Sequence, residues 1–463
     1  MANLLVVDPV TRLEGHLRVE VGVETVGGVQ QVVEARLAGT SFRGFERLLE
    51  GRAPAEAAHL TQRICGVCSV PHGVVASMAL EATGGAQIPT NARILRNFVL
   101  AANFLQSHIL HFYHLSLLDF AAGPDSPPWT PAWKADLRIG PEDSARLIEH
   151  YKQALGIVRQ VNEMAAIFAG RQPHSPAFIA GGFTQIPTRE AIEQAKVYVK
   201  AIAEFVRSLY IPDVDFVANQ YPEYGKLGRG TGNFMSFGVF DLGDRTSLFG
   251  PGRISDGSTE IQPVDPQAIR ETVVRSWFED SAPNRHPSEG VTQAAYPKEG
   301  AYSWLKAPRY DGRPYETGPL ARMWIAGRYR TGISVNDRHK ARARESLILA
   351  EALSGWLAGL EVGGTAYTAY TPPVDGTGAA LTEAPRGALG HWLRITGGKI
   401  AHYQIITPTC WNASPRDDAN QPGPIEQALV GTPVQDREHP VEVLRVVHAF
   451  DPCLACAVHA LRI

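Results

Sequence analysis

Apolar and polar residues alternate along the first part of the chain and predict a β-hairpin. The alternation covers residues 16–21 and returns at 31–35, with Gly27 and Gly28 between the two stretches. A period of two places every second side chain on one face of a strand, and paired glycines favour a tight turn. We therefore expect a hairpin over about residues 1–40.

From Phe45 onward the apolar residues recur at three- and four-residue steps, which is the period of a helix. The clearest such run covers 91–120 and ends at a Pro-rich stretch. Capping and periodicity indicate further helices at 141–169, at 188–209 with Thr188 as the N-cap, and at 341–360. We expect a helical core over about residues 45–210.

The middle of the chain, about residues 221–318, is dense in Gly and Pro and lacks a helical period. We expect strands and long ordered loops there, and again loops and short strands at 367–402 within a helical and C-terminal metal-binding region of about 341–463. No repeat or low-complexity linker divides the chain. The prediction is a single domain over 1–463 that is mostly α with irregular β pieces, an α+β fold.

Composition excludes some classes of partner. The chain is 44% hydrophobic and 20% charged, and its net charge of -3 gives no reason to expect nucleic acid as a partner. No apolar run approaches the roughly 18 residues that a membrane-spanning helix needs, and the first residues lack the features of a signal peptide. We expect a cytoplasmic protein that does not itself span a membrane and that is membrane-associated, if at all, through partners.

Four of the five cysteines form two C-x-x-C pairs near opposite ends of the chain, Cys65 with Cys68 and Cys453 with Cys456. So few cysteines, grouped in this way, indicate metal or redox chemistry rather than a disulfide scaffold. A C-x-x-C turn lets both thiolates reach one ion, and two such turns can form a four-sulfur site. We therefore expect a metal site that joins the N- and C-terminal regions.

Spacing alone leaves the metal open. A structural zinc site is the commonest use of such pairs, but zinc ribbons hold their pairs within tens of residues, and here a histidine follows each pair, His72 and His459. A thioredoxin-like redox motif would need only one pair and a βαβ context. Thiolates also bind nickel, copper(I) and iron clusters.

Several stretches resemble, in the right order, the motifs of the large subunit of nickel-iron hydrogenases. They are Arg12–His16, Arg43–Glu46 with Thr61–Cys68, Ser303–Tyr310, Glu383–Gly387, Pro408–Asn412 and Asp451–His459. The resemblance runs over nearly the whole chain and implies that family's fold, with long central helices around the metal site. A relative of this fold in respiratory complex I lacks the four cysteines and is a poorer match.

The resemblance implies a nickel-iron centre held by the four cysteines. Cys65 and Cys453 would be terminal nickel ligands, and Cys68 and Cys456 would bridge to an iron that carries two cyanides and one carbon monoxide. H2 would be cleaved heterolytically, with the proton leaving through a thiolate.

Four further residues would act beside the metals. The resemblance implies that Glu14 accepts the proton, that Arg386 lies over the metals, that Asp451 pairs with Arg386, and that His72 hydrogen-bonds to a bridging sulfur. A guanidinium suits this place because it stays charged and donates up to about five hydrogen bonds. Without the resemblance, Glu14 and Asp451 would be interpreted as solvated carboxylates.

Four positions complete the implied site. Pro385 would shape the loop of the arginine, the Thr409 hydroxyl would donate to a cyanide, and Glu46 and His459 would hold a magnesium or similar ion. An oxygen-rich ligand set suits such a hard cation. Alone, Glu46 would be interpreted as a surface carboxylate.

Other candidates receive plainer interpretations. Ser107 stands where many members of the family have an aspartate, and Cys410 is expected to be a small packing residue, although its nearness to the site leaves an oxidation-sensitive role open. The histidines of the long helix are expected to bond to neighbouring groups or face a partner rather than bind metal; they are His108, His111 and His114. The glycines at 228–232 are expected to form an ordinary loop.

The predicted function is reversible H2 oxidation biased toward uptake. Cys410 alone lies outside the two pairs, which is too few cysteines for iron-sulfur clusters in this chain. The resemblance therefore implies an obligate heterodimer with an iron-sulfur small subunit, or a dimer of such heterodimers, assembled with the help of maturation proteins. Four residues follow His459, which fits either a trimmed tail or a short family form. The alternatives are a regulatory H2 sensor with low turnover and a structural metal-binding protein.

Overall fold

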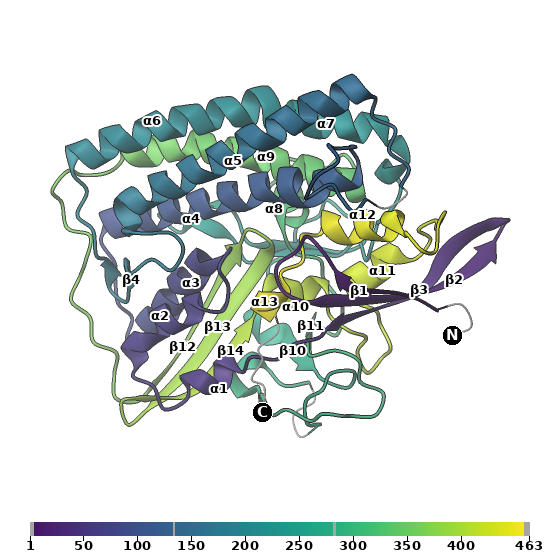
Figure 1. Cartoon of the computed structure of the whole chain (residues 1–463). Helices are drawn as coiled ribbons and strands as arrows, with labels where there is room; N and C mark the ends of the chain where they lie inside the picture. The colour runs from purple at the N-terminus through teal and green to yellow at the C-terminus, as the bar shows by residue number, and fades with distance from the viewer. Residues whose placement is uncertain (1–3, 133–134, 281–283, 458–463) are drawn as a thin grey trace.

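Long helices form one layer of the molecule, and a sheet with shorter helices lies beneath it (Figure 1). The computed structural model describes residues 4–132, 135–280 and 284–457. The long helices are α4 (Thr90–Leu110), α5 (Pro141–Ala169), α6 (Arg189–Phe205), α7 (Ile211–Gln220) and α9 (Val335–Ala358). Among the described residues, no helix combines the length and apolar character that crossing a membrane requires.

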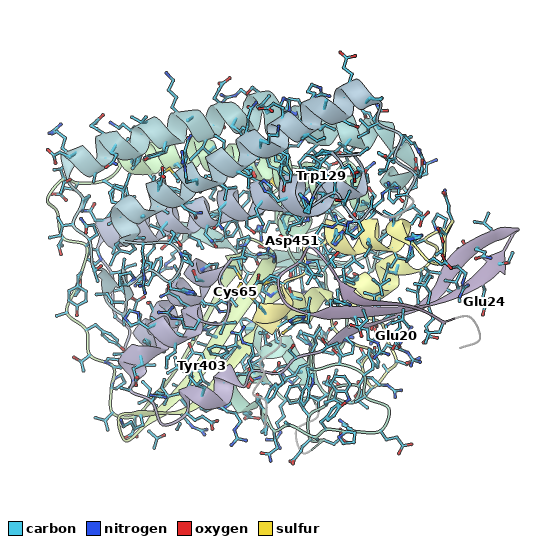
Figure 2. The ribbon with its side chains drawn as sticks, in the orientation of Figure 1. Glu20, Glu24, Cys65, Trp129, Tyr403 and Asp451 are labelled. Atoms are coloured by element: carbon cyan, nitrogen blue, oxygen red, sulfur yellow. The ribbon has the colours of Figure 1, made fainter. Side chains whose placement is uncertain are left out.

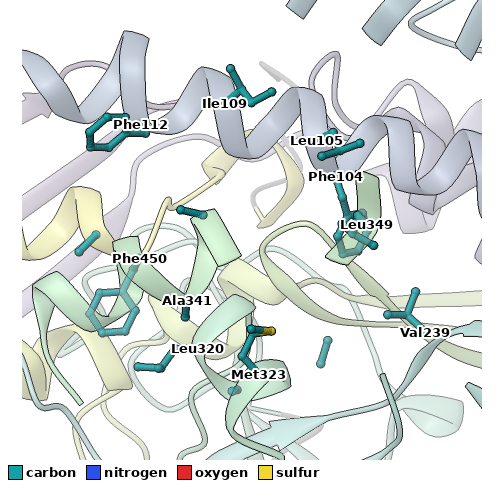
Figure 3. Close-up of a cluster of buried hydrophobic side chains, with 14 of the residues drawn as sticks. Phe104, Leu105, Ile109, Phe112, Val239, Leu320, Met323, Ala341, Leu349 and Phe450 are labelled. Carbon is teal, nitrogen blue, oxygen red and sulfur yellow. The ribbon is translucent and has the colours of Figure 1, made fainter. Parts of the chain in front are cut away.

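Helix α4 is the centre of this layer and packs against α3 (Ser69–Ala82), α5 and α9. Buried side chains of α4 belong to the same hydrophobic cluster as side chains of α9 and of α8 (Pro319–Ile325) (Figure 3). The labelled members of that cluster are Phe104, Leu105, Ile109 and Phe112 of α4, Ala341 and Leu349 of α9, Leu320 and Met323 of α8, together with Val239 and Phe450.

The predicted long helices are confirmed, with informative differences at their ends. Helix α5 has the predicted bounds, and the Thr188 hydroxyl caps α6 by accepting from the Ala191 amide at 3.2 Å. Helix α4 gives way to π-helical and 3-10 turns over His111–Asp119, where its predicted continuation lies. Helix α9 begins at Val335, before the predicted start, because Ser334 caps it through the Asp337 amide.

The N-terminal hairpin is confirmed and gains a strand. Strands β1 (Leu4–Val10), β2 (Leu17–Val26) and β3 (Val29–Gly39) form an antiparallel sheet in that order. The alternating pattern missed β1 because its sequence opens with an unbroken apolar run. The β1–β2 connection, residues 11–16, carries the Arg12–His16 motif toward the centre of the molecule.

The loops and strands expected at 367–402 are present, but the strands are longer than expected and form a second antiparallel sheet. It consists of β12 (Gly376–Ala384), β13 (Gly387–Thr396) and β14 (Lys399–Ile406). Strand β13 is buried along nearly its whole length, and a strand covered on both faces lacks the alternation that marks a half-exposed one. Because Ala384 pairs with Gly387, Pro385 and Arg386 form the two-residue turn of the β12–β13 hairpin.

Short elements complete the fold, and the middle of the chain contains the predicted strands and loops. The short strands are β4 (Phe178–Ile179), β5 (Gly182–Phe183), β6 (Phe234–Ser236), β7 (Val239–Gly243), β8 (Thr246–Phe249), β9 (Gly252–Ile254), β10 (Ile269–Thr272) and β11 (Ala307–Tyr310). The short helices are α1 (Phe45–Leu49), α2 (Ala57–Gln62), α10 (Pro408–Asn412), α11 (Pro424–Leu429), α12 (Val441–Ala449) and α13 (Leu454–Ala457). The predicted α+β class is therefore confirmed.

Candidate metal centre

The two cysteine pairs meet in the middle of the molecule (Figure 2), where they pack in one cluster with buried residues of the β12–β14 sheet. Figure 2 shows Cys65 and Asp451 there, drawn from opposite ends of the chain. The sulfurs of Cys65, Cys68, Cys453 and Cys456 all lie within 4.8 Å of one another, and all four residues are buried. None of them forms a disulfide, so four sulfur donors converge on one point.

The spacing within the cluster is uneven. The Sγ atoms of Cys68 and Cys456 are 2.8 Å apart and those of Cys453 and Cys456 are 3.1 Å apart, whereas those of Cys65 and Cys453 are 3.6 Å apart and those of Cys68 and Cys453 are 4.0 Å apart. Hydrogen bonding from Cys453 lowers the pKa of the Cys65 thiol well below its usual value, while burial raises the pKa of Cys456. Thiols packed this closely in a buried place are arranged to share a cation.

Local backbone geometry holds the first pair. Cys68 immediately precedes α3, and the Cys65 sulfur accepts the amides of Val67 at 3.3 Å and Cys68 at 3.4 Å. Both donors come from the same C-x-x-C turn. The first pair is therefore shaped by the segment that contains it.

Remote segments hold the second pair. The Glu14 carbonyl accepts the Leu454 amide at 2.6 Å, and Glu14 forms a parallel bridge with Cys453. Gly15 makes this approach possible, because it has a φ of +90° and an added Cβ would lie 2.4 Å from the Ala455 amide nitrogen. The glycine of the Arg12–His16 motif thus has a physical reason: it joins the β1–β2 connection to α13.

Arg386 and Asp451 form a buried ion pair next to the cysteines, as the resemblance implied. Arg386 Nη2 lies 3.0 Å from Asp451 Oδ1, and its Nε donates to the Asp451 carbonyl at 3.0 Å. Arg386 Nη1 and Asp451 Oδ2 have no hydrogen-bond partner among the described residues. Burial disfavours the positive charge of Arg386 and lowers its pKa. The negative charges of Asp451 and of the cysteine sulfurs outweigh burial, so the pKa of Arg386 lies well above its usual value.

Thr409 and Pro385 lie on the walls of the same site. The Thr409 hydroxyl, on α10, accepts the Cys453 amide at 2.9 Å, which leaves its own proton for a further acceptor. Pro385 presents its carbonyl to Arg322, a buried arginine of α8, at 2.8 Å. The Thr409 hydroxyl therefore holds the backbone of Cys453 in place, and Arg322 holds the backbone of Pro385.

Glu14 is half-buried rather than solvated, so its plain interpretation as a surface carboxylate is wrong. Burial, and next the charge of Cys65, raise the pKa of the Glu14 carboxyl above its usual value. Asp451 is likewise buried, and burial raises its pKa although Arg386 and Arg342 oppose the shift.

His72 and its neighbours form a buried chain of rings behind the first cysteine pair. The His72 Nδ1 lies 3.2 Å from the His391 Nε2, and the His391 Nδ1 lies 2.8 Å from the Tyr403 hydroxyl. His72 lies on α3, one helical turn after Cys68. The expected bond from His72 to a bridging sulfur stays a prediction.

Glu46 lies in a separate buried polar cluster and is not a surface carboxylate. It accepts the Ile405 amide at 3.0 Å and the Thr292 hydroxyl, and lies 3.6 Å from the Lys306 Nζ. Lys306 is also 4.0 Å from Glu271, whose pKa burial raises to about 7. The other predicted ligand, His459, lies outside the described residues.

Ser107 and Cys410, the two residues that depart from the family pattern, are both buried. Ser107 is on α4, and its hydroxyl has no partner among the described residues. The Thr407 hydroxyl donates to the Cys410 sulfur at 3.4 Å, and burial raises the pKa of that thiol to about 11, which agrees with a packing residue.

The helix histidines bond to neighbouring groups, as expected. His108 lies 2.8 Å from Glu345, His111 donates to the His448 carbonyl at 2.6 Å, and His114 donates to the Tyr151 carbonyl at 3.2 Å.

Several buried charged residues near the site carried no signal in the sequence. Arg322, Glu345, Glu383 and Lys306 are polar residues that only tertiary packing identifies as buried. Lys306 and Glu383 lie inside stretches that resemble family motifs, but nothing in their spacing indicated a role.

Comparison with known proteins agrees with this site. A family model described as nickel-dependent hydrogenase matches residues 43–123, 123–332 and 328–459, and a model described as HoxL-like matches residues 4–37. The periplasmic NiFeSe hydrogenase large subunit of Desulfomicrobium baculatum is 41% identical, and the match covers 98% of this chain and 94% of that protein. The Hydrogenase-2 large chain of Escherichia coli is 31% identical, with 100% and 98% covered.

The fold agrees as well. The Ni-Fe-Se hydrogenase from D. vulgaris Hildenborough in the reduced state superposes with a TM-score of 0.95 at 41% sequence identity. The superposition covers 99% of this chain and 100% of that one.

Proposed function

The chain belongs to the nickel-dependent hydrogenase family, and from that premise we propose how its own residues carry out the reaction. It is the large, catalytic subunit of a nickel-iron hydrogenase, an oxidoreductase that cleaves H2 into protons and electrons. The observation that carries the assignment to this chain is the buried cluster of four sulfurs from both of its ends.

The four cysteines fit a nickel-iron group. Soft thiolates suit nickel, and the buried cluster offers four of them within 4.8 Å. Cys65 and Cys453 would be terminal ligands. Cys68 and Cys456 would be the bridging ligands, as the resemblance to the family implies. When bound, this group supplies the centre at which H2 is cleaved and its electrons are taken up.

Glu14 would take the proton from the Cys453 thiol. Its backbone bridge to Cys453 holds it beside the cluster. Burial raises the pKa of the Glu14 carboxyl above its usual value, which makes the carboxylate a better proton acceptor.

Arg386 would bind and polarise the substrate and anchor the diatomic ligands of the iron. Its Nη1 is a buried donor without a protein partner among the described residues, and such a donor is costly unless a ligand accepts from it. Asp451 would hold the guanidinium in place. Thr409 would donate its free proton to a cyanide, and Pro385 would shape the turn beneath it.

Glu46 and His459 would hold a magnesium or similar ion, whose waters could carry protons outward. The residue that fits this role is Glu46 itself, a buried carboxylate with hard oxygen atoms of the kind that such an ion prefers. His72 would hydrogen-bond to a bridging sulfur.

Large subunits of this family pair with a small subunit. For this chain we propose an obligate heterodimer whose partner carries the iron-sulfur clusters, because Cys410 is the only cysteine outside the four-sulfur set. Maturation proteins would insert the metals. We also propose that residues 1–463 act as one domain, since both ends contribute to one site.

For the compartment, the sequence predicts the cytoplasm, whereas the D. baculatum relative is named as periplasmic. Fractionation of the native cells distinguishes the two.

H2-dependent dye reduction by the purified heterodimer tests the function. Steady turnover is expected. Turnover near zero in protein that contains the intact metal group would contradict catalysis and favour a sensor, and zinc in place of nickel would favour a structural protein.

A further inference from the structure

Arg322 is a fully buried arginine whose five N–H donors all have acceptors. Its Nε and Nη2 donate to the two carboxylate oxygens of Glu345 at 2.7 and 2.8 Å, and its Nη1 donates to Glu383 at 2.8 Å. The remaining donors reach the carbonyls of Ala384 at 3.0 Å and Pro385 at 2.8 Å. A planar guanidinium with every donor engaged has one orientation, so it fixes the direction of both carbonyls.

Those two carbonyls immediately precede Arg386. Pro385 and Arg386 form the turn of the β12–β13 hairpin, so the peptide that Arg322 holds is the one that places the Arg386 side chain over the cysteines. The turn is closely packed against the start of α8. A Cβ added to Gly318 would lie 2.9 Å from the Arg386 carbonyl oxygen, and one added to Gly387 would lie 2.2 Å from the Thr317 hydroxyl.

The partners of Arg322 tie this turn to three other elements. Glu345 lies on α9 and also accepts from His108 of α4, 2.8 Å away, while Glu383 lies on β12 and accepts the Phe237 amide at 2.8 Å. The side chains of Arg322, Glu345 and Glu383 have no exposed surface. Movement of the Arg386 turn would therefore break buried charged contacts, which is costly.

We propose that Arg322 is a positioning residue for Arg386, which it holds over the metal group through the Ala384 and Pro385 carbonyls. The proposal rests on the proposed function, since it takes Arg386 as the residue that contacts substrate and diatomic ligands. A lysine at position 322 keeps the charge but loses the fork that engages both carboxylates and both carbonyls.

The chain provides a matched control in Arg96. It too is a buried arginine, it forms a two-pronged pair with Glu81, and it donates to the Ile179 and Gly182 carbonyls, both at 2.8 Å. Those carbonyls belong to the β4–β5 hairpin, which carries none of the proposed site residues. A purely structural role would make the two arginines equivalent.

Arg322→Lys and Arg96→Lys are compared in the heterodimer by thermal unfolding, nickel content, infrared spectrum and turnover per nickel. Both variants lose stability. Only Arg322→Lys shifts the cyanide and carbon monoxide bands and lowers turnover per nickel, by about tenfold to a hundredfold, since displacement of a catalytic group by about 1 Å can cost a hundredfold.

Unchanged bands and turnover per nickel in Arg322→Lys overturn the proposal. If that variant contains no nickel, Glu383→Gln replaces it: shifted bands support the proposal and unshifted bands overturn it. Loss of nickel from both, while Arg96→Lys stays loaded, also supports it. Wild-type protein that lacks these bands contradicts the proposed function itself, so the two failures are distinguishable.

Discussion

The two cysteine pairs have the same spacing but are held in different ways. The first pair lies in the turn before α3, where the Cys65 sulfur accepts the amides of Val67 and Cys68 from its own loop. The second pair depends on distant segments, because the Cys453 amide donates to Thr409 and Glu14 bridges to Cys453. One half of the metal site is therefore local structure and the other half is tertiary structure.

This difference links metal binding to catalysis. The segments that hold the second pair are the ones that carry Glu14 and Thr409, so docking of the second pair also places the proposed proton acceptor and cyanide donor. A buried contact stabilises that docking, since Asp119 pairs with Arg12 and lies 2.6 Å from His448. The β1–β2 connection and the segment that leads to Asp451 are thereby held together.

The largest effect is expected from the ligands of both pairs. Cys65→Ser and Cys453→Ser should each lose nickel and reduce turnover to background, because a hydroxyl is a poor ligand for a soft metal. Metal analysis and H2-dependent dye reduction measure this. Cys410→Ser is the control and should keep its nickel. Full nickel occupancy in either ligand variant would contradict the four-cysteine site.

Two glycine substitutions distinguish the second cysteine pair, which remote segments hold, from the first pair, which its own turn holds. Gly15→Ala should destabilise the protein by about 3 kcal/mol or more, because its φ is positive and the new Cβ would meet the Ala455 backbone. Gly66→Ala, inside the first pair, places its Cβ in open space and should be tolerated. Chemical unfolding compares them. Equal losses in the two variants would remove the proposed difference between the pairs.

Glu14→Gln tests whether the remote contact serves chemistry as well as structure. The backbone bridge stays, so nickel content should not change, while turnover should fall by about a hundredfold with the loss of the proton acceptor. The exposed Glu24→Gln on β2 is the control and should have wild-type turnover. Wild-type activity in Glu14→Gln would show that protons leave by another route.

The smallest effect on stability is expected when a single threonine hydroxyl near each cysteine pair is removed. Thr409→Val leaves the buried Cys453 amide without its acceptor and should cost about 1–3 kcal/mol. Thr61→Val removes only a donor to the Ala57 and His72 carbonyls and should cost less. Thermal unfolding of the heterodimer measures both. If Thr61→Val lost more stability than Thr409→Val, the first cysteine pair and not the second would depend more on the threonine hydroxyl beside it.

The sequence predicted the parts of this site that follow from local rules or family motifs. Helix α5 and the Thr188 cap are local patterns, and the two C-x-x-C turns are recognisable by spacing. Strand β13 was missed because burial on both faces removes its alternation. Arg322 was missed because its role exists only once α8, α9 and the β12–β13 turn meet.

The burial of Glu14, Glu46 and Asp451 has the same explanation. A carboxylate in a loop is usually solvated, and nothing local distinguishes one that tertiary packing encloses. The family motifs identified these residues, but only the fold shows why Gly15 must follow Glu14.

An infrared spectrum of the purified heterodimer, with metal analysis of the same sample, tests the central claim most directly. If the two cysteine pairs hold a nickel-iron group, the sample contains about one nickel per large subunit and absorbs in the cyanide and carbon monoxide region. A sample that contains zinc or no metal in the four-sulfur site, and that lacks those bands, would contradict the account.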